Sequence, residues 1–169
     1  MSTKIQPSLD EARSGEITSW VRIVWGVALE RFKGEEGWHA EMGGCCAIGH
    51  PITRKIQYKK VLGTVSEEER VHYETAACEQ IKELAARHGQ KGWDGKDSWE
   101  GAIVAERVII SFFGVGMPQM GCQAVALVIA VRTKELSFCG AEVIANMSEN
   151  PYFAQLHEAV EKSIQKATA

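Results

Sequence analysis

The sequence lacks any apolar run long enough to cross a membrane. Its longest run, AVALVIAV at 124–131, is far shorter than the roughly 20 residues that a membrane-spanning helix needs. The first fifteen residues, MSTKIQPSLDEARSG, contain no apolar core of the kind found in a secretory signal peptide. We therefore expect a cytoplasmic protein without a membrane partner.

An excess of basic residues and a regular cysteine framework are also missing. The 169 residues include 19 Lys and Arg against 22 Asp and Glu, and the densest basic run is TRKIQYKK at 53–60. Domains that bind duplex nucleic acid usually present a broad positive face, so we expect no nucleic-acid partner. The five cysteines form an odd set without regular spacing, which indicates reduced thiols rather than disulfides.

The common catalytic motifs do not occur. The sequence contains no G-x-S-x-G, P-loop, H-E-x-x-H or C-x-x-C pattern. This removes the usual signatures of α/β-hydrolases, P-loop nucleotide hydrolases, zincins and thioredoxin-like oxidoreductases. Gly114 and Gly116 lack the third glycine of a dinucleotide fingerprint. These patterns leave open whether the chain is an enzyme.

What the sequence does contain is the composition of a globular domain, with 45% apolar and 24% charged residues. It shows no repeats and no low-complexity linker, so we expect residues 1–169 to form a single domain. Capping signals and the helical spacing of apolar residues predict three helices. They are expected to run from after Pro7 to Gly34, from Ser66 to His88, and from Asn150-Pro151 onward.

Strands are expected in the remaining apolar segments. The stretch 39–46, taken as extended, and 54–63, in which apolar and basic residues alternate as in an edge strand, predict a hairpin. The runs 101–115 and 136–147 are rich in β-branched and aromatic residues. Residues 121–136 fit a buried strand or a helix, and their β-branched content favours a strand. The resulting order, α-β-β-α-β-β-β-α, indicates an α+β domain with a mainly antiparallel sheet and helices packed on it.

Side chains suited to binding gather in GWHAEMGGCCAIGHPI, residues 37–52. A second stretch, FFGVGMPQMGC at 112–122, follows an apolar run, and its glycines permit either a sharp turn or the close approach of a ligand. Together they predict a small-molecule pocket between segments 38–50 and 114–122. The ligand-binding residues expected there are His39, Cys45, His50, Gly114, Gly116 and Met117.

A metal-dependent enzyme is the alternative. HAE at 39–41 and PQMGC at 118–122 partly match the zinc-deaminase signature H-x-E…P-C-x-x-C. In this interpretation His39 and Cys122 bind zinc, and Glu41 is the catalytic acid-base group of a hydrolase or deaminase. Gln119 stands where the signature has its first cysteine, so the match is incomplete. Zinc is the cofactor that this alternative requires.

A third possibility comes from GQKGWDGKDSWEG at 89–101, which is expected to be a polar surface loop. Tryptophan is enriched at protein interfaces, so Trp93 and Trp99 favour a protein-interaction scaffold. The leading hypothesis is nevertheless a small-molecule-binding domain that assembles as a homo-oligomer.

Overall fold

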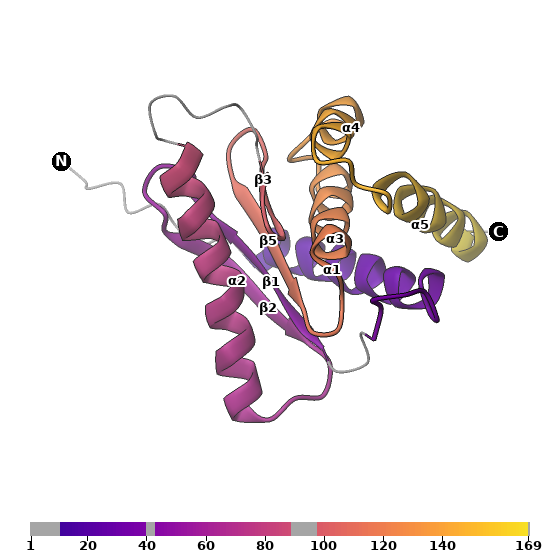
Figure 1. The fold of residues 1–169 in the computed structure, drawn as a ribbon, viewed down its shortest axis with the longest axis horizontal. Helices are drawn as coiled ribbons and strands as arrows, with labels where there is room; N and C mark the ends of the chain where they lie inside the picture. Colours follow the sequence, from indigo (N-terminus) through magenta and orange to yellow (C-terminus); the bar gives the residue numbers. More distant parts are fainter. Residues whose placement is uncertain (1–10, 40–42, 89–97, 169) are drawn as a thin grey trace.

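The computed structural model describes residues 11–39, 43–88 and 98–168. The elements in these ranges are α1 (Glu11–Arg31), β1 (Gly44–Gly49), β2 (Ile56–Leu62), α2 (Glu67–His88), β3 (Ser98–Trp99), β4 (Ala102–Val104), β5 (Ile109–Gly114), α3 (Gln119–Arg132), α4 (Phe138–Met147) and α5 (Phe153–Thr168). The predicted α+β class and the order α-β-β-α-β-β-β-α are confirmed as far as α3, and two further helices follow (Figure 1).

The strands form one antiparallel sheet in the order β2-β1-β5-β4-β3. Gly44 at the start of β1 faces Leu62 of β2 on one side and Gly114 of β5 on the other. The strand β2 lies at the edge of the sheet, as the alternation of apolar and basic residues predicts. Helix α2 covers one face, whereas α3 covers the other and is packed against α1 and α5 (Figure 1).

Every residue of β1 is buried because helices cover both faces of the sheet. Cys45 and Ala47 point to the side of α2, whereas Cys46 and Ile48 point to the side of α3. Successive side chains of a strand point to opposite faces, so an apolar run without alternation is what a strand between two helical layers requires.

Residues 121–132 belong to helix α3, and the strand predicted at 121–136 is wrong. Every residue from Gly121 to Ala130 is buried, since the sheet lies on one side of α3 while α1, α4 and α5 pack on others. A helix that is apolar all round shows no helical period in its sequence. Its pattern therefore matches that of a buried strand.

The strand predicted at 136–147 is also wrong, because these residues contain α4. Ser137 precedes the helix, and its hydroxyl oxygen accepts a hydrogen bond from the backbone N–H of Gly140 at 3.0 Å. Serine at this position satisfies one of the backbone donors that a helix start leaves unpaired. This local signal favours a helix and outweighs the strand propensity of the residues that follow.

The run 101–115 contains two strands, because the chain turns back between β4 and β5. Glu106 and Arg107 are exposed in this turn, which is closed by a hydrogen bond from Ala105 N–H to the carbonyl of Val108 at 2.8 Å. A charged pair inside an apolar run thus marks a turn at the surface. The second part of the run, β5, is buried on both faces except at Phe113.

Two predicted helix starts are confirmed by their hydrogen bonds. Ser66 N–H donates to the Glu69 carboxylate, and Glu69 N–H donates to the Ser66 hydroxyl, both at 3.1 Å. This reciprocal pair is a capping box. Before α5, the Asn150 side-chain oxygen accepts hydrogen bonds from Tyr152 N–H and Phe153 N–H at 2.8 and 3.1 Å.

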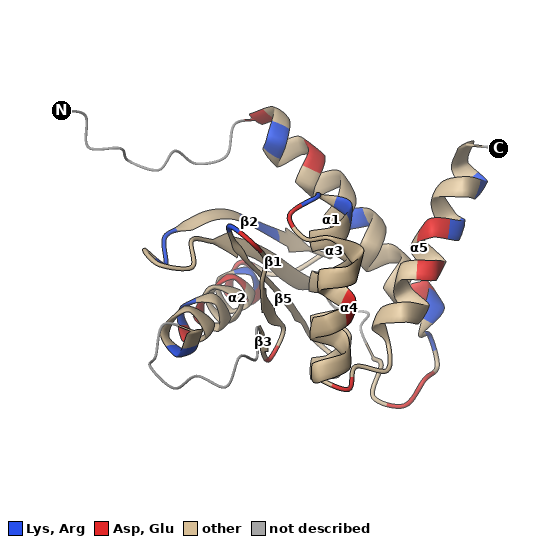
Figure 2. Ribbon diagram, turned by 90° about the horizontal axis from the view of Figure 1, so that it is seen from above, with Lys and Arg blue, Asp and Glu red and all other residues tan. Residues whose placement is uncertain are grey.

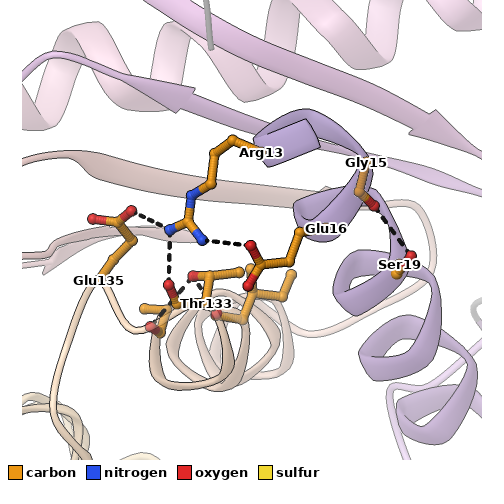
Figure 3. A network of polar contacts seen from close by, with 8 residues as sticks. Arg13, Gly15, Glu16, Ser19, Thr133 and Glu135 are labelled. Atoms are coloured by element: carbon orange, nitrogen blue, oxygen red, sulfur yellow. Dashed lines mark hydrogen bonds and ion pairs between the residues drawn. The ribbon is translucent and has the colours of Figure 1, made fainter. Parts of the chain in front are cut away.

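The first turn of α1 is attached to the end of α3 through Arg13 (Figure 3). Its Nη2 donates to the carbonyl of Thr133 at 2.7 Å and to the Glu135 carboxylate at 2.5 Å, and Nη1 donates to Glu16 at 3.2 Å. A cation at a helix C-terminus interacts favourably with the helix dipole. Arg13 therefore fixes where α1 crosses α3.

Charges of both signs are interspersed along α1, α2 and α5, so these helices present no broad face of one sign (Figure 2). Within helices, several oppositely charged side chains lie one turn apart, as in the pair Lys162–Glu158 at 3.0 Å. In the described ranges no helix combines the length and the apolar character required to cross a bilayer.

Candidate functional site

The connection between α1 and β1 lies against the turn that joins β5 to α3. His39 N–H donates to the carbonyl of Gly116 at 2.5 Å, and Val115 N–H donates to the carbonyl of Gly43 at 3.0 Å. Gly116 has φ of 77°, in the left-handed region that glycine adopts without steric cost. The two segments that the sequence analysis singled out are therefore in direct contact.

Trp38 is the largest side chain at this contact and is only 6% exposed. Its ring stacks on Phe32 with centroids 4.6 Å apart and meets Tyr152 edge-on at 5.2 Å. The ring also lies against the first turn of α3, because a Cβ atom at Gly121 would be 2.6 Å from Trp38 Cζ2. Glycine at position 121 is what allows the indole to approach the helix backbone so closely.

The indole Nε1 of Trp38 is buried and has no hydrogen-bond partner among the described residues. A buried donor without a partner costs about 1–3 kcal/mol. Such groups are uncommon in folded proteins, where nearly all buried donors are paired. This N–H is therefore an unsatisfied donor on a side chain that also lines the groove described next.

A surface groove of about 770 Å³ runs between α1 and the segment that follows it. Its volume is within the range of about 300–1,000 Å³ that is typical of small-molecule sites. Gly26 has no atoms within 4 Å of where a side chain would start, which keeps this part of the groove open. The lining residues are Gly26, Leu29, Glu30, Lys33, Gly34, Trp38 and His39.

Of the predicted ligand-binding residues, His39 lines this groove with an exposed side chain. Cys45 does not, because it is fully buried on the α2 side of the sheet. Burial raises the pKa of the Cys45 thiol to about 12. The neutral thiol therefore acts as a small core side chain.

His50 lies at the opposite end of β1 from the glycine contact. A strand advances about 3.3 Å per residue. His50 comes seven residues after Gly43, with the six residues of β1 between them, so the two lie about 23 Å apart. Its Nδ1 accepts hydrogen bonds from the backbone N–H groups of Ile52 and Thr53, both at 3.1 Å. His50 therefore stabilises a turn, and the structure does not bring it near His39.

Gly114 and Met117 belong to the contact between the segments but not to the lining of the groove. A side chain at Gly114 would collide with Met117 Sδ, so the methionine fills the space above the glycine. Gly114, Gly116 and Met117 thus belong to the turn between β5 and α3 that packs against the segment before β1.

The metal-enzyme alternative depends on residues that the structure describes only in part. Glu41 lies outside the described residues. Cys122 is 6% exposed, and burial raises the pKa of its thiol to about 11. In the ranges 11–39, 43–88 and 98–168, no three His, Cys, Asp or Glu side chains are grouped so as to hold a metal ion. A zinc site with His39 and Cys122 stays a prediction.

Trp38 and the α1 side of the groove were not predicted from the sequence. The available signal was a tryptophan next to a glycine at the start of the 37–52 stretch, since a large ring in a polar connection has to be packed somewhere. The outward face of α1 carried no such signal. Leu29 and Lys33 become candidates for the site only because the chain turns back after Gly34 and places Trp38 and His39 on the other side of the groove.

Comparison of the chain with models of protein families, with curated proteins and with solved structures gives no match in any of the three. The functional interpretation therefore depends on the geometry of the groove and on the chemistry of the side chains that line it.

Proposed function

We propose that the protein binds a small organic molecule in the groove between α1 and Trp38–His39. The observation that carries the proposal is the unpaired, buried Nε1–H of Trp38, a side chain that lines this groove. A ligand with a hydrogen-bond acceptor would satisfy that donor once a small rotation of the indole turns Nε1 towards the groove, and this would remove the free-energy cost of leaving it unpaired.

The remaining lining residues define the class of ligand. Lys33 and His39 supply further donors beside Trp38, Leu29 and the open space at Gly26 supply an apolar surface, and Glu30 supplies one carboxylate that a bound acid has to avoid. A carboxylate forms stronger hydrogen bonds than a neutral acceptor. The best fit is a small acid whose carboxylate lies near Trp38 and Lys33 and whose apolar body extends along α1.

The test is a screen of small carboxylic acids against the ¹⁵N-labelled chain, observing the indole N–H signals of its five tryptophans. Trp38→Phe assigns the Trp38 signal and removes the donor while keeping an aromatic ring. A ligand at 100 times its Kd stabilises the fold by about 2.7 kcal/mol, which raises Tm by about 5–10 °C in a chain of this length.

Trp25→Phe is the matched control. Trp25 is on α1, and its Nε1 is also buried and unpaired among the described residues, but it does not line the groove. We expect binding to weaken about tenfold in Trp38→Phe, as for the loss of a hydrogen bond to a charged group, and to persist in Trp25→Phe. Equal affinity in the two variants, or the absence of any acid that shifts the Trp38 signal, would refute the proposal.

The homo-oligomer and the cytoplasmic location stay predictions. Exposed apolar side chains one turn apart on α4 support self-association, since Val143 is 57% and Met147 is 48% exposed. Sedimentation of the wild type and of Val143→Asp tests this, because a charge in an apolar interface would shift the species towards the monomer.

A further inference from the structure

A second cavity is lined by residues of α2, of the β3–β4 turn and of the end of β5. Helix α2 lies on the face of the sheet opposite α3 (Figure 1). The volume of the cavity is about 370 Å³, and the sheet separates it from the α1 groove. The lining residues are Ala76, Glu79, Gln80, Glu83, Trp99, Glu100 and Phe113.

Gln80 supplies a buried polar group to this cavity, since the residue is only 8% exposed. Its Oε1 accepts a hydrogen bond at 2.6 Å from the hydroxyl of Ser111, which is fully buried in β5. The amide nitrogen of Gln80 has no partner among the described residues. A carboxamide that is held by its oxygen and keeps its N–H₂ group available is oriented to donate to a ligand.

Three carboxylates surround the cavity. Glu79 and Glu83 are one turn apart on α2, and Glu100 is in the two-residue β3–β4 turn. Glu83 pairs with Arg87 at 3.1 Å and Glu79 with Lys82 at 3.7 Å, whereas Glu100 has no ion pair in the described part of the chain. The negative charge around the cavity is therefore only partly compensated.

The carboxylates do not converge as a metal site would, since the described residues contain no group of three that could hold a metal ion. The aromatic lining points instead to an organic cation. The guanidinium of Arg87 already lies over the Trp99 ring, 3.5 Å from its centroid, so this ring acts as a cation acceptor within the chain itself. Phe113 adds a second aromatic wall.

We infer that this cavity binds a small organic cation, an amine or guanidine that also carries a neutral hydrogen-bond acceptor. The cationic group lies among Glu79, Glu83 and Glu100, and the acceptor receives the free N–H of Gln80. This inference does not depend on the proposed α1 groove, because the two sites share no residue.

The test uses two probes of the same shape, Nα-acetyl-arginine amide and Nα-acetyl-citrulline amide. The first has a guanidinium and the second a neutral urea, and both offer amide carbonyls. Each is titrated into the ¹⁵N-labelled full chain while the Trp99 indole and Gln80 side-chain signals are followed, assigned with Trp99→Phe and Gln80→Met. We expect the arginine probe to bind about tenfold more tightly than the citrulline probe, from the sum of several exposed charge pairs.

Glu100→Gln and Glu142→Gln form the matched pair of variants. Both remove one exposed carboxylate, but Glu142 is on α4, on the other face of the sheet. We expect a loss of about twofold to fivefold in affinity for the arginine probe in Glu100→Gln, and none in Glu142→Gln. Because Glu100 is exposed in a turn, this variant keeps the fold even if Gln80→Met does not.

Two results would overturn the inference. One is equal affinity for the charged and the neutral probe, and the other is equal affinity of Glu100→Gln and Glu142→Gln for the arginine probe. Failure of acids to bind the α1 groove would leave this result unaffected, so the two proposals are tested separately.

Discussion

Replacing Gly121 by alanine tests whether Trp38 is held as tightly as its contacts indicate. The new Cβ would lie 2.6 and 2.7 Å from Trp38 Cζ2 and Cη2, whereas ordinary contacts of a Cβ begin near 3.4 Å. The indole cannot easily move away, because Phe32 stacks on it and Tyr152 meets it edge-on. The substitution therefore overpacks the junction between α3 and the segment before β1.

The magnitude follows from two opposing effects. Overpacking of a core typically costs about 1–3 kcal/mol, whereas alanine in place of a helical glycine contributes about 0.5–1 kcal/mol of stability. We expect Gly121→Ala to lower the free energy of unfolding by about 1–2 kcal/mol. Gly15→Ala is the control, because Gly15 is in α1 with nothing within 4 Å of the new Cβ, and we expect it to raise stability by about 0.5–1 kcal/mol.

Equilibrium unfolding in urea measures both variants. The double variant Gly121→Ala/Trp38→Phe tests the cause, since the smaller ring withdraws the two atoms that collide and should reduce the cost of the alanine. If Gly121→Ala is as stable as Gly15→Ala, the indole does not lie against α3 as described. The proposed binding role of its N–H would then lose its geometric basis.

Three further predictions concern pH, thiols and metals. The pKa of Glu69 is lowered mainly by the hydrogen bond from Ser66 N–H. The carboxylate therefore stabilises the fold above its ordinary pKa near 4.5, and this contribution is lost as the pH falls through the lower pKa of the folded state. In urea titrations, the difference in free energy of unfolding between the wild type and Glu69→Gln should disappear at acid pH. A thiol reagent should modify the exposed Cys139 in the native protein, whereas the buried Cys45, Cys46 and Cys122 should react only after unfolding. Mass spectrometry of the labelled peptides measures which cysteines have reacted. Dialysis against EDTA should leave the Tm and the affinity for carboxylic acids unchanged. A zinc content of about one per chain that is lost in His39→Ala would instead support the metal-dependent enzyme.

The polar residues predicted to form the site are close in the sequence but not all close in the structure. His39 and His50 are close in the sequence, but the six-residue strand β1 separates them, because it takes the chain from one end of the sheet to the other. Cys45 and Cys46 point to opposite faces of the same strand. Of the pocket predicted between segments 38–50 and 114–122, the structure contains a backbone contact near the start of the first segment, where His39 and Gly43 meet Gly116 and Val115. Glycines in both segments permit this close approach.

Local chemistry in the sequence determined the starts of α2 and α5 and the edge position of β2. These depend on residues a few positions apart, such as Ser66 and Glu69, whose hydrogen bonds form within one helical turn. The sequence could not determine the state of 121–136, because an apolar run fits any element that is buried on all sides. Only the tertiary structure, by enclosing α3 between the sheet and the other helices, decided that this run is a helix. The tertiary structure also decided that Trp38 lies against Gly121 with an unpaired N–H. That position depends on the packing of α1, α3 and the turn between β5 and α3, which are far apart in the sequence.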